Sequence, residues 1–205
     1  MGLTTSLILT NESVASGQLE AWGLTPIKEN GDLWTAFHAP ANRFFAVARP
    51  GNWTVLWDPE MQIAEHFETN SLPLPGTWHV ASTVSSTGFV DYRVFVDGTL
   101  VRHLLAGDEE LDEGVPVVDE SAFVFREGSE AGEPAEVDGD LIIQELPRAV
   151  GAVGYRDDLF DVEGQYFAYR TTKQDVHGNR SANEGAATTT VRKRASFFGR
   201  LFGKK

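Results

Sequence analysis

Short apolar runs separated by turn sequences fill the first hundred residues, and this pattern is typical of an antiparallel sheet. Residues 3–9 (LTTSLIL) predict a first strand, and residues 12–22 carry apolar side chains at helical spacing, which predicts a short amphipathic helix. Gly23 follows as a helix stop. The next three runs are rich in aromatic and β-branched residues and predict an antiparallel meander at residues 33–39, 43–48 and 53–57.

A second group of runs repeats this theme. They predict strands at residues 77–85, 89–96 and 99–105. The dipeptide Asp97-Gly98 between the last two has the composition of a type I′ hairpin turn. Asp58-Pro59 separates the two groups and predicts a helix start, with Asp58 as the cap and Pro59 in the first helical position. Two meanders, each beside a helical stretch, suggest an internal duplication, although the halves do not align residue by residue.

The composition changes after Gly107. Residues 107–114 (GDEELDEG) hold five acids and predict a solvated loop, and residues 127–140 predict a flexible acidic excursion. Residues 140–150 predict a helix whose second half is disfavoured by Pro147. The segment 159–170 predicts a short helix or turn followed by a strand.

These elements predict a fold of the α+β class, in which a Trp-rich and mostly antiparallel sheet is flanked by a few short helices. A single domain over residues 1–170 is expected, since 205 residues suffice for one globular core. Residues 171–190 lack any hydrophobic period and predict a flexible polar linker. Residues 191–205 predict a basic amphipathic tail.

Charge is distributed unevenly along the chain. The formal net charge is −13, from 17 basic and 30 acidic residues. Six of the basic residues and none of the acids lie from Arg192 onward, so the body before Arg192 is more acidic than the whole. An acidic body repels phosphate backbones, so no nucleic-acid partner is expected.

Three absences in the sequence narrow the classes of protein. There is no cysteine, which excludes disulfides, thiolate metal sites and iron–sulfur clusters. No apolar run is long enough for a membrane-spanning helix, and the N-terminal segment lacks the basic start of a secretory signal. The sequence therefore predicts a cytoplasmic location, with transient membrane association through the tail as an alternative.

Signatures of common chemistry are missing from the sequence. There is no nucleophile elbow, no phosphate-binding glycine loop and no helical zinc pair, so we assign no catalytic residue, no metal ligand and no cofactor. His38, His79 and His103 lie in predicted strands, where half-buried, hydrogen-bonded histidines are expected. A metal site that joins such histidines across neighbouring strands would leave no sequence spacing, and it is kept as an alternative. The acidic run at 107–114 lacks the spacing of a calcium loop.

Tryptophans are concentrated in the β-rich part of the chain. Trp53 and Trp57 are four residues apart, so an extended strand places both on one face. Packing in the core is the favoured interpretation, and a recognition face is the alternative.

The C-terminal tail combines apolar and basic side chains. Four apolar residues share one face of a helix, and all nearby charges are positive. A docking stripe of this kind fits the acidic body, a groove on another protein or an anionic membrane surface. We expect the interaction tail to consist of Phe197, Phe198, Arg200, Leu201, Phe202, Lys204 and Lys205.

These observations predict a non-enzymatic cytosolic protein-binding module, of adaptor or inhibitor type, that uses an acidic body and a docking tail. A protein partner is therefore expected. One alternative is a peripheral membrane protein anchored by the tail at an anionic surface. The other is an enzyme whose site joins strand histidines to Asp58, Asp91 or Glu120.

Overall fold

A computed structural model describes residues 3–38, 44–68, 73–125, 136–154 and 158–170. The chain divides into two compact units, Met1–Tyr169 and Arg170–Lys205, and every described helix and strand belongs to the first. The predicted linker and the interaction tail lie outside the described residues, so both stay predictions, as does the boundary at residue 170.

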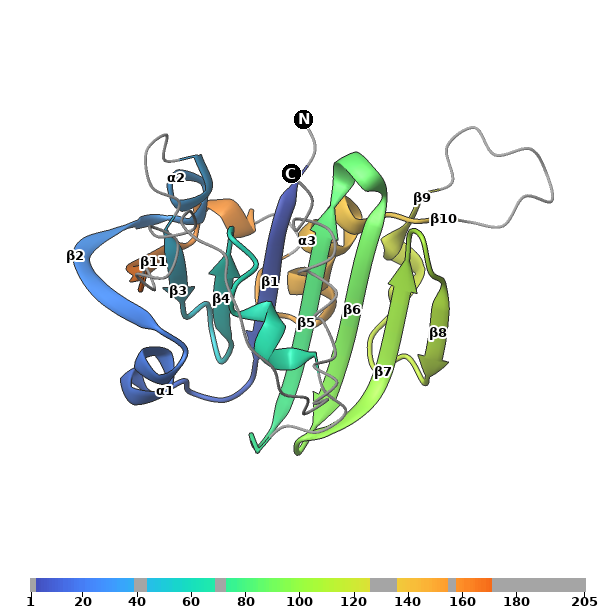
Figure 1. The fold of residues 1–205 in the computed structure, drawn as a ribbon, viewed down its shortest axis with the longest axis horizontal. Helices are drawn as coiled ribbons and strands as arrows, with labels where there is room; N and C mark the ends of the chain where they lie inside the picture. The colour runs from blue at the N-terminus through green and yellow to red at the C-terminus, as the bar shows by residue number, and fades with distance from the viewer. Residues whose placement is uncertain (1–2, 39–43, 69–72, 126–135, 155–157, 171–205) are drawn as a thin grey trace, which may run out of the picture. The chain divides into compact units, whose positions relative to one another are not determined.

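The first unit is built on one sheet of nine strands, and neighbouring strands are antiparallel throughout (Figure 1). Their order across the sheet is β2-β11-β3-β4-β1-β5-β6-β7-β8. The strands are β1 (Thr4–Thr10), β2 (Leu24–Asp32), β3 (Phe45–Ala48), β4 (Thr54–Asp58), β5 (Thr77–Val84), β6 (Phe89–Val96), β7 (Thr99–Ala106), β8 (Leu111–Gly114) and β11 (Glu163–Tyr169).

Short helices and turns complete this unit. The helices and 3₁₀ turns are α1 (Ser16–Ala21), α2 (Leu33–His38), α3 (Gly139–Ala149), η1 (Ala64–Phe67), η2 (Ser85–Thr87), η3 (Glu120–Phe123) and η4 (Leu159–Asp161). A separate two-stranded ladder pairs β9 (Val124–Phe125) with β10 (Glu136–Val137).

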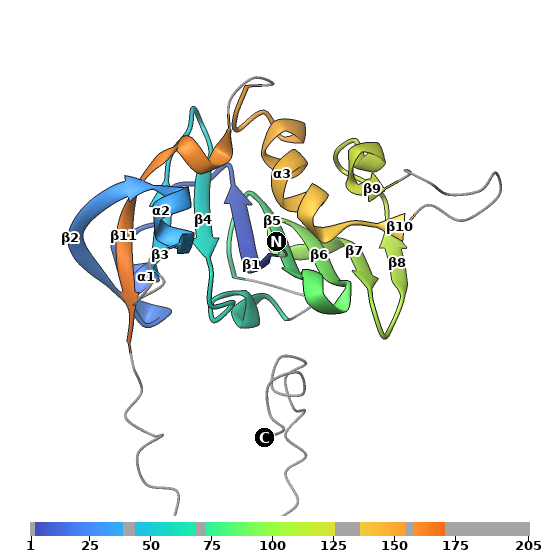
Figure 2. The same cartoon turned by 90° about the horizontal axis from the view of Figure 1, so that it is seen from above.

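The central strands are buried on both faces. Leu7 and Leu9 of β1 join a core cluster on one face with side chains of α2, η3, α3 and η4, whereas Ile8 points into the opposite cluster with side chains of α1 and η1. Figure 2 shows α3 over one face and the η1 segment on the other side of the sheet. This explains why residues 3–9 are apolar almost without interruption, since a strand covered on both faces does not alternate.

The structure confirms the sequence prediction of a mostly antiparallel sheet with a few short helices. Strands β1 and β3 to β7 lie within two residues of their predicted bounds. Asp97 and Gly98 have φ angles of 47° and 78°, as a type I′ turn between β6 and β7 requires.

The first predicted meander is wrong in one element. Residues 33–38 form α2, because the preceding segment is the long strand β2 and Asp32 ends it as a helix cap. The Asp32 Oδ1 atom accepts a hydrogen bond from the Thr35 N–H at 2.6 Å. Without a strand at 33–39 the two halves do not match, so the suggested internal duplication is also wrong.

Four other expectations change. The helix expected at 12–22 is limited to α1, and the helix expected at Asp58-Pro59 is replaced by a turn and η1. The acidic segment 107–114 contains the edge strand β8 instead of being a loop throughout. Helix α3 continues through Pro147, whose missing N–H affects only the last turn.

Candidate functional site

Strand β8 forms one edge of the sheet and lies within the acidic segment 107–114. Strand β8 pairs with β7 alone, from Leu105 opposite Leu111 to Arg102 opposite Gly114. Within the described part of the chain no strand pairs with the outer side of β8. Its outward-facing N–H and C=O groups are therefore arranged as in any sheet edge that can accept another strand.

Arg102 holds this edge in place. Its side chain is 3% exposed and reaches two segments at once. The guanidinium donates to both carboxylate oxygens of Glu120 in η3, at 3.0 and 2.7 Å, and to the Glu113 carbonyl of β8 at 3.0 Å. A further ion pair joins it to Asp112. The two carboxylates raise the pKa of Arg102, so the buried fork stays charged and ties β7, β8 and η3 together.

Gly114 ends β8 in a conformation that other residues rarely adopt. Its φ is 86°, and a Cβ at this position would lie 2.0 Å from the Val101 carbonyl oxygen of β7. The glycine therefore allows the two backbones to approach closely where the chain leaves the sheet.

We expect Gly114→Ala to separate β8 from β7. The left-handed φ and the backbone clash together should cost about 1–3 kcal/mol of unfolding free energy. Amide hydrogen exchange should become faster at residues 111–114 and 102–105. Gly51→Ala is the matched control, because Gly51 also has a left-handed φ of 59° but has open space around its Cβ position. Equal exchange in both variants would show that the close approach at Gly114 does not support the edge.

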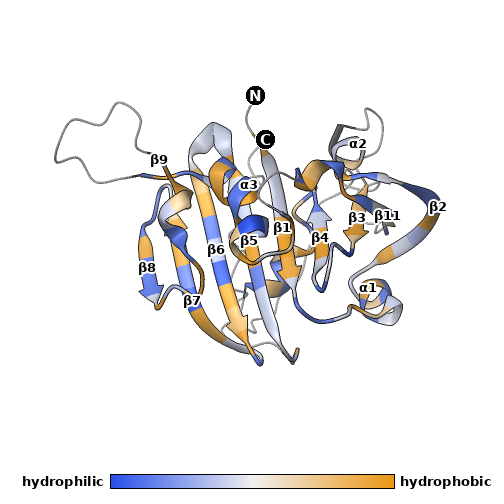
Figure 3. Cartoon of the chain, turned by 180° about the vertical axis from the view of Figure 1, so that it is seen from behind, coloured by the Kyte–Doolittle hydropathy of each residue, from blue (hydrophilic) through white to orange (hydrophobic). Residues whose placement is uncertain are grey.

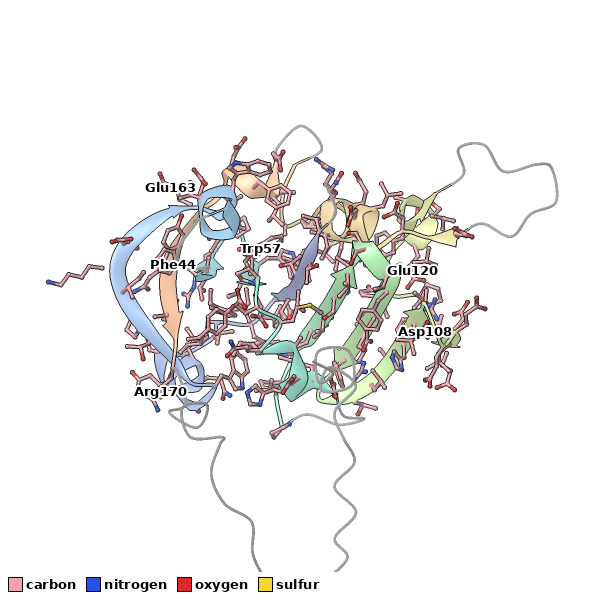
Figure 4. All side chains as sticks on the ribbon, turned by 45° about the horizontal axis from the view of Figure 1, so that its top comes forward. Phe44, Trp57, Asp108, Glu120, Glu163 and Arg170 are labelled. Carbon is pink, nitrogen blue, oxygen red and sulfur yellow. The ribbon has the colours of Figure 1, made fainter. Side chains whose placement is uncertain are left out.

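The surface along β8 is acidic and carries two exposed valines. Asp108, Glu109 and Glu110 are exposed in the segment that leads into the strand. Beyond it, Val115 is 74% exposed and Val117 is 44% exposed. Figure 3 shows hydrophilic colouring on β8, and Figure 4 shows Asp108 and Glu120 at the same end of the sheet.

A second charged group lies one strand further in, on the face that contains the Ile8 cluster. The Asp91 carboxylate accepts hydrogen bonds from Arg93 Nε at 2.9 Å and Nη2 at 2.7 Å, and Asp91 Oδ1 lies 3.1 Å from His103 Nε2. Arg93 Nη1 also donates to the Phe67 carbonyl at 2.9 Å, so the group connects β6 and β7 to the end of η1. A carboxylate beside a histidine can serve acid–base chemistry, but here it is already neutralised by the Arg93 fork.

Asp58 is a buried carboxylate on the same face. Its Oδ1 accepts from the Tyr169 hydroxyl at 2.6 Å, and its Oδ2 accepts from the Ile63 and Ala64 N–H groups at 2.6 and 3.2 Å. Complete burial raises the pKa of Asp58 to about 6, against the hydrogen bonds that lower it. These contacts fix the turn before η1 and tie the late strand β11 to β4.

His79 lies on the opposite face of the sheet, in the core. Its Nδ1 is 3.0 Å from the Tyr92 hydroxyl, and the two rings are stacked with an interplanar angle of 15°. Burial lowers the pKa of His79 to about 4, so the imidazole is neutral at pH 7. The side chain is 2% exposed, which leaves it no access to a substrate.

The three histidines that the sequence placed in strands therefore lie in three different environments. His103 meets Asp91, one of the three carboxylates considered for an enzyme, and His79 meets a tyrosine. His38 lies in α2 rather than in a strand. His79 and His103 sit on opposite faces, since one is opposite Val94 and the other opposite Arg93 in the register, so they do not form a common site. Among the described residues no group of three or more histidines, aspartates and glutamates could hold a metal ion.

Core packing is confirmed for two of the tryptophans. Trp57 is fully buried and Trp78 is 3% exposed. Trp53 and Trp57 face the same core cluster, as their spacing predicts. Trp34 is 55% exposed on α2, where its ring contacts Phe160 edge to face at 5.7 Å.

Comparison of the chain with known protein families, with curated proteins and with solved structures gave no match. Within the described ranges no helix is both long and apolar enough to cross a membrane.

Proposed function

We propose that this protein is a non-enzymatic binding module that takes up a basic, extended segment of a partner protein along the outer side of β8. The observation that carries this proposal is the combination of an open strand edge with acidic side chains before it and exposed valines after it. An extended segment that adds to a sheet gains main-chain hydrogen bonds from the edge, and it gains specificity from the side chains alongside.

Charge selects the class of partner. Asp108, Glu109 and Glu110 are exposed beside the edge, so they attract lysine and arginine side chains and repel a second copy of the same acidic edge. Val115 and Val117 offer apolar contact for residues between the basic ones. A strand of only four residues favours weak and reversible binding that depends on salt.

The position of this edge is fixed before a partner arrives. Arg102 ties β8 to η3, and Gly114 permits the close contact with β7. A preformed edge lowers the ordering cost of binding, because only the incoming segment has to lose conformational freedom.

A charge-reversal pair tests this proposal. The probe is a labelled peptide of alternating lysine and valine, and its affinity for the full-length protein is measured by fluorescence anisotropy. Glu109→Lys with Glu110→Lys should weaken binding about tenfold or more, since both charges lie beside the edge. Glu20→Lys with Glu65→Lys is the control, because these exposed residues lie on α1 and η1 and give the same change in net charge.

Equal weakening by both pairs would contradict the proposal, since it would reduce the interaction to the overall charge of the protein. A peptide methylated on alternate backbone nitrogens provides a second control, because it keeps the charge but cannot pair as a strand. If this peptide binds as well as the parent peptide, strand addition at β8 is wrong.

The interaction tail would supply a second contact with a partner or with an anionic membrane, and it stays a prediction. The enzyme alternative has one supporting contact, between His103 and Asp91. We favour the binding module because the β8 edge is open on its outer side, whereas Asp91 is already shared between two cationic or hydrogen-bonding side chains.

A further inference from the structure

A cavity of about 360 Å³ lies at the far end of the sheet from β8, where α1 and the segment before it cover β3, β11 and β2. Its volume is near the lower limit of small-molecule sites, which is about 300 Å³. The cavity is thus large enough for a small metabolite and is separate from the β8 edge.

An irregular strand pairing lies beside this cavity. Asn30 is opposite Gln165, but the next pair joins Pro26 to Phe167, so four steps along β2 match two steps along β11. The intervening part of β2 bows away from the sheet, as the outward curve of β2 in Figure 1 shows. On the other side of β11, Val47 is opposite Gln165, which places Val47, Gln165 and Asn30 in one row along the cavity.

The floor of the cavity is apolar. Val14, Leu19 and Phe167 are 5%, 3% and 4% exposed and belong to the core cluster on this face, and Val47 packs against them. These three side chains are already covered, so the half-buried Val47 offers the apolar surface that an aliphatic group of a ligand can contact.

The rim of the cavity carries one positive and one negative side chain. Arg49 follows β3 and Glu163 begins β11, and both are exposed. The register pairs Ala48 with Gly164, so one further antiparallel step places Arg49 opposite Glu163. Figure 4 shows Glu163 at one end of β11.

The Arg49 and Glu163 side chains are not in direct contact. No ion pair joins Arg49 or Glu163 to any residue within the described ranges, although the register makes them neighbours. The hydrogen bond given for Arg49 runs from Nη2 to the Val14 carbonyl at 3.4 Å, which steadies the side chain at the rim. Most donors of the Arg49 fork and the Glu163 carboxylate thus remain available for a ligand.

We propose that this cavity binds a free α-amino acid with an apolar side chain. The Arg49 guanidinium matches a carboxylate in planar, two-point geometry, and the Glu163 carboxylate accepts hydrogen bonds from an ammonium group. Asn30 and Gln165 lie in the neighbouring row of the register and add carboxamide groups beside this pair, and the half-buried Val47 contacts the apolar side chain of the ligand. A free α-amino acid carries a carboxylate, an ammonium group and an apolar side chain on one carbon atom, so it can contact Arg49, Glu163 and the cavity floor at the same time.

This site and the β8 edge are at opposite ends of the sheet, so either proposal can fail without the other. The full-length protein is titrated with leucine by isothermal calorimetry, and the comparison ligands are leucine amide and N-acetylleucine. Leucine amide lacks the carboxylate and N-acetylleucine lacks the ammonium group. Each should bind about tenfold or more weakly than leucine, because each leaves one charged rim group without its partner.

Variants assign each charge to its residue. Arg49→Gln should weaken leucine binding about tenfold and abolish the difference between leucine and leucine amide, and Glu163→Gln should do the same for N-acetylleucine. Arg170→Gln and Glu65→Gln are matched controls, since these exposed residues lie outside the cavity. Unchanged unfolding curves should accompany all four substitutions, because none of the residues is buried.

Three outcomes would overturn the proposal. The first is an absence of binding for every standard amino acid at millimolar concentration. The second is equal affinity for leucine and its two derivatives, because the rim charges would then play no part. The third is equal weakening by Arg170→Gln and Arg49→Gln, which would place the binding elsewhere.

Discussion

Arg102→Met should lower the free energy of unfolding by about 3–5 kcal/mol, because it removes one partner of a buried ion pair and leaves the other charged. The Glu120 side chain is 13% exposed and would keep its charge without the bidentate fork. Methionine fills a similar volume but donates no hydrogen bond, so the Glu113 carbonyl also loses its partner. Urea unfolding followed by intrinsic fluorescence measures the loss.

A second substitution distinguishes the buried charge from lost packing. Combining Arg102→Met with Glu120→Gln removes the unpaired charge and should recover a large part of the stability. Arg148→Met is the control, since its pair with Glu145 is partly exposed at 26% and 31% and is expected to contribute about 1 kcal/mol or less. If the double variant is no more stable than Arg102→Met, packing rather than charge accounts for the effect.

Asp58→Asn and His79→Asn should change the pH dependence of stability in opposite directions. The folded protein holds the Asp58 proton up to about pH 6, against an ordinary pKa of 3.8. The contribution of this group to stability therefore decreases as the pH rises from 4 to 6. His79 has a folded pKa of about 4 against 6.5, so its contribution is lost as pH falls from 6.5 to 4. Each shift corresponds to about 3 kcal/mol.

In the parent protein the pH dependences of stability from Asp58 and His79 are opposite in sign and nearly cancel. Each single substitution removes one of them and leaves the pH dependence of the other measurable. Relative to the parent, Asp58→Asn should gain about 3 kcal/mol of unfolding free energy between pH 4 and 7, and His79→Asn should lose about as much. The asparagine side chain can still form hydrogen bonds at both positions and does not titrate, which limits other changes. Urea unfolding at several pH values checks this, and parallel curves for both variants would refute it.

Local patterns predicted those strands that depend on local chemistry. Asp97-Gly98 fixes the β6–β7 hairpin through left-handed backbone angles, which two residues are enough to determine. The apolar run of β1 predicted a strand, and its lack of alternation is explained by cover on both faces. Such signals need no knowledge of distant parts of the chain.

Elements that depend on distant partners were missed for the same reason. Strand β2 reads LTPIKENGD, with a proline, a glycine and exposed polar residues, and it becomes a strand by pairing with β11. Strand β8 is an acidic segment that becomes a strand through pairing with β7 and the contacts of Arg102. Propensity alone predicts a loop for both, since tertiary pairing outweighs it.

The candidate sites were hidden by the same limit. The sequence identified the acidic run but could not show that it borders an open strand edge. Likewise, Arg49 and Glu163 are separated by more than a hundred residues, and only the β3–β11 register makes them neighbours. No spacing rule within a single segment could join them.

The insertion of β11 between β2 and β3 has a consequence for the time course of protein synthesis. Glu163 pairs with Asp32, so the partner of β2 leaves the ribosome about 130 residues later. At roughly 5–20 residues per second, β2 and the facing edge of β3 wait about 7–26 s without a partner. During that interval the nascent chain presents two unpaired edges, which other nascent chains can join. A ribosome that stalls before residue 163 would release a product without β11, in which β2 cannot be joined to the rest of the sheet.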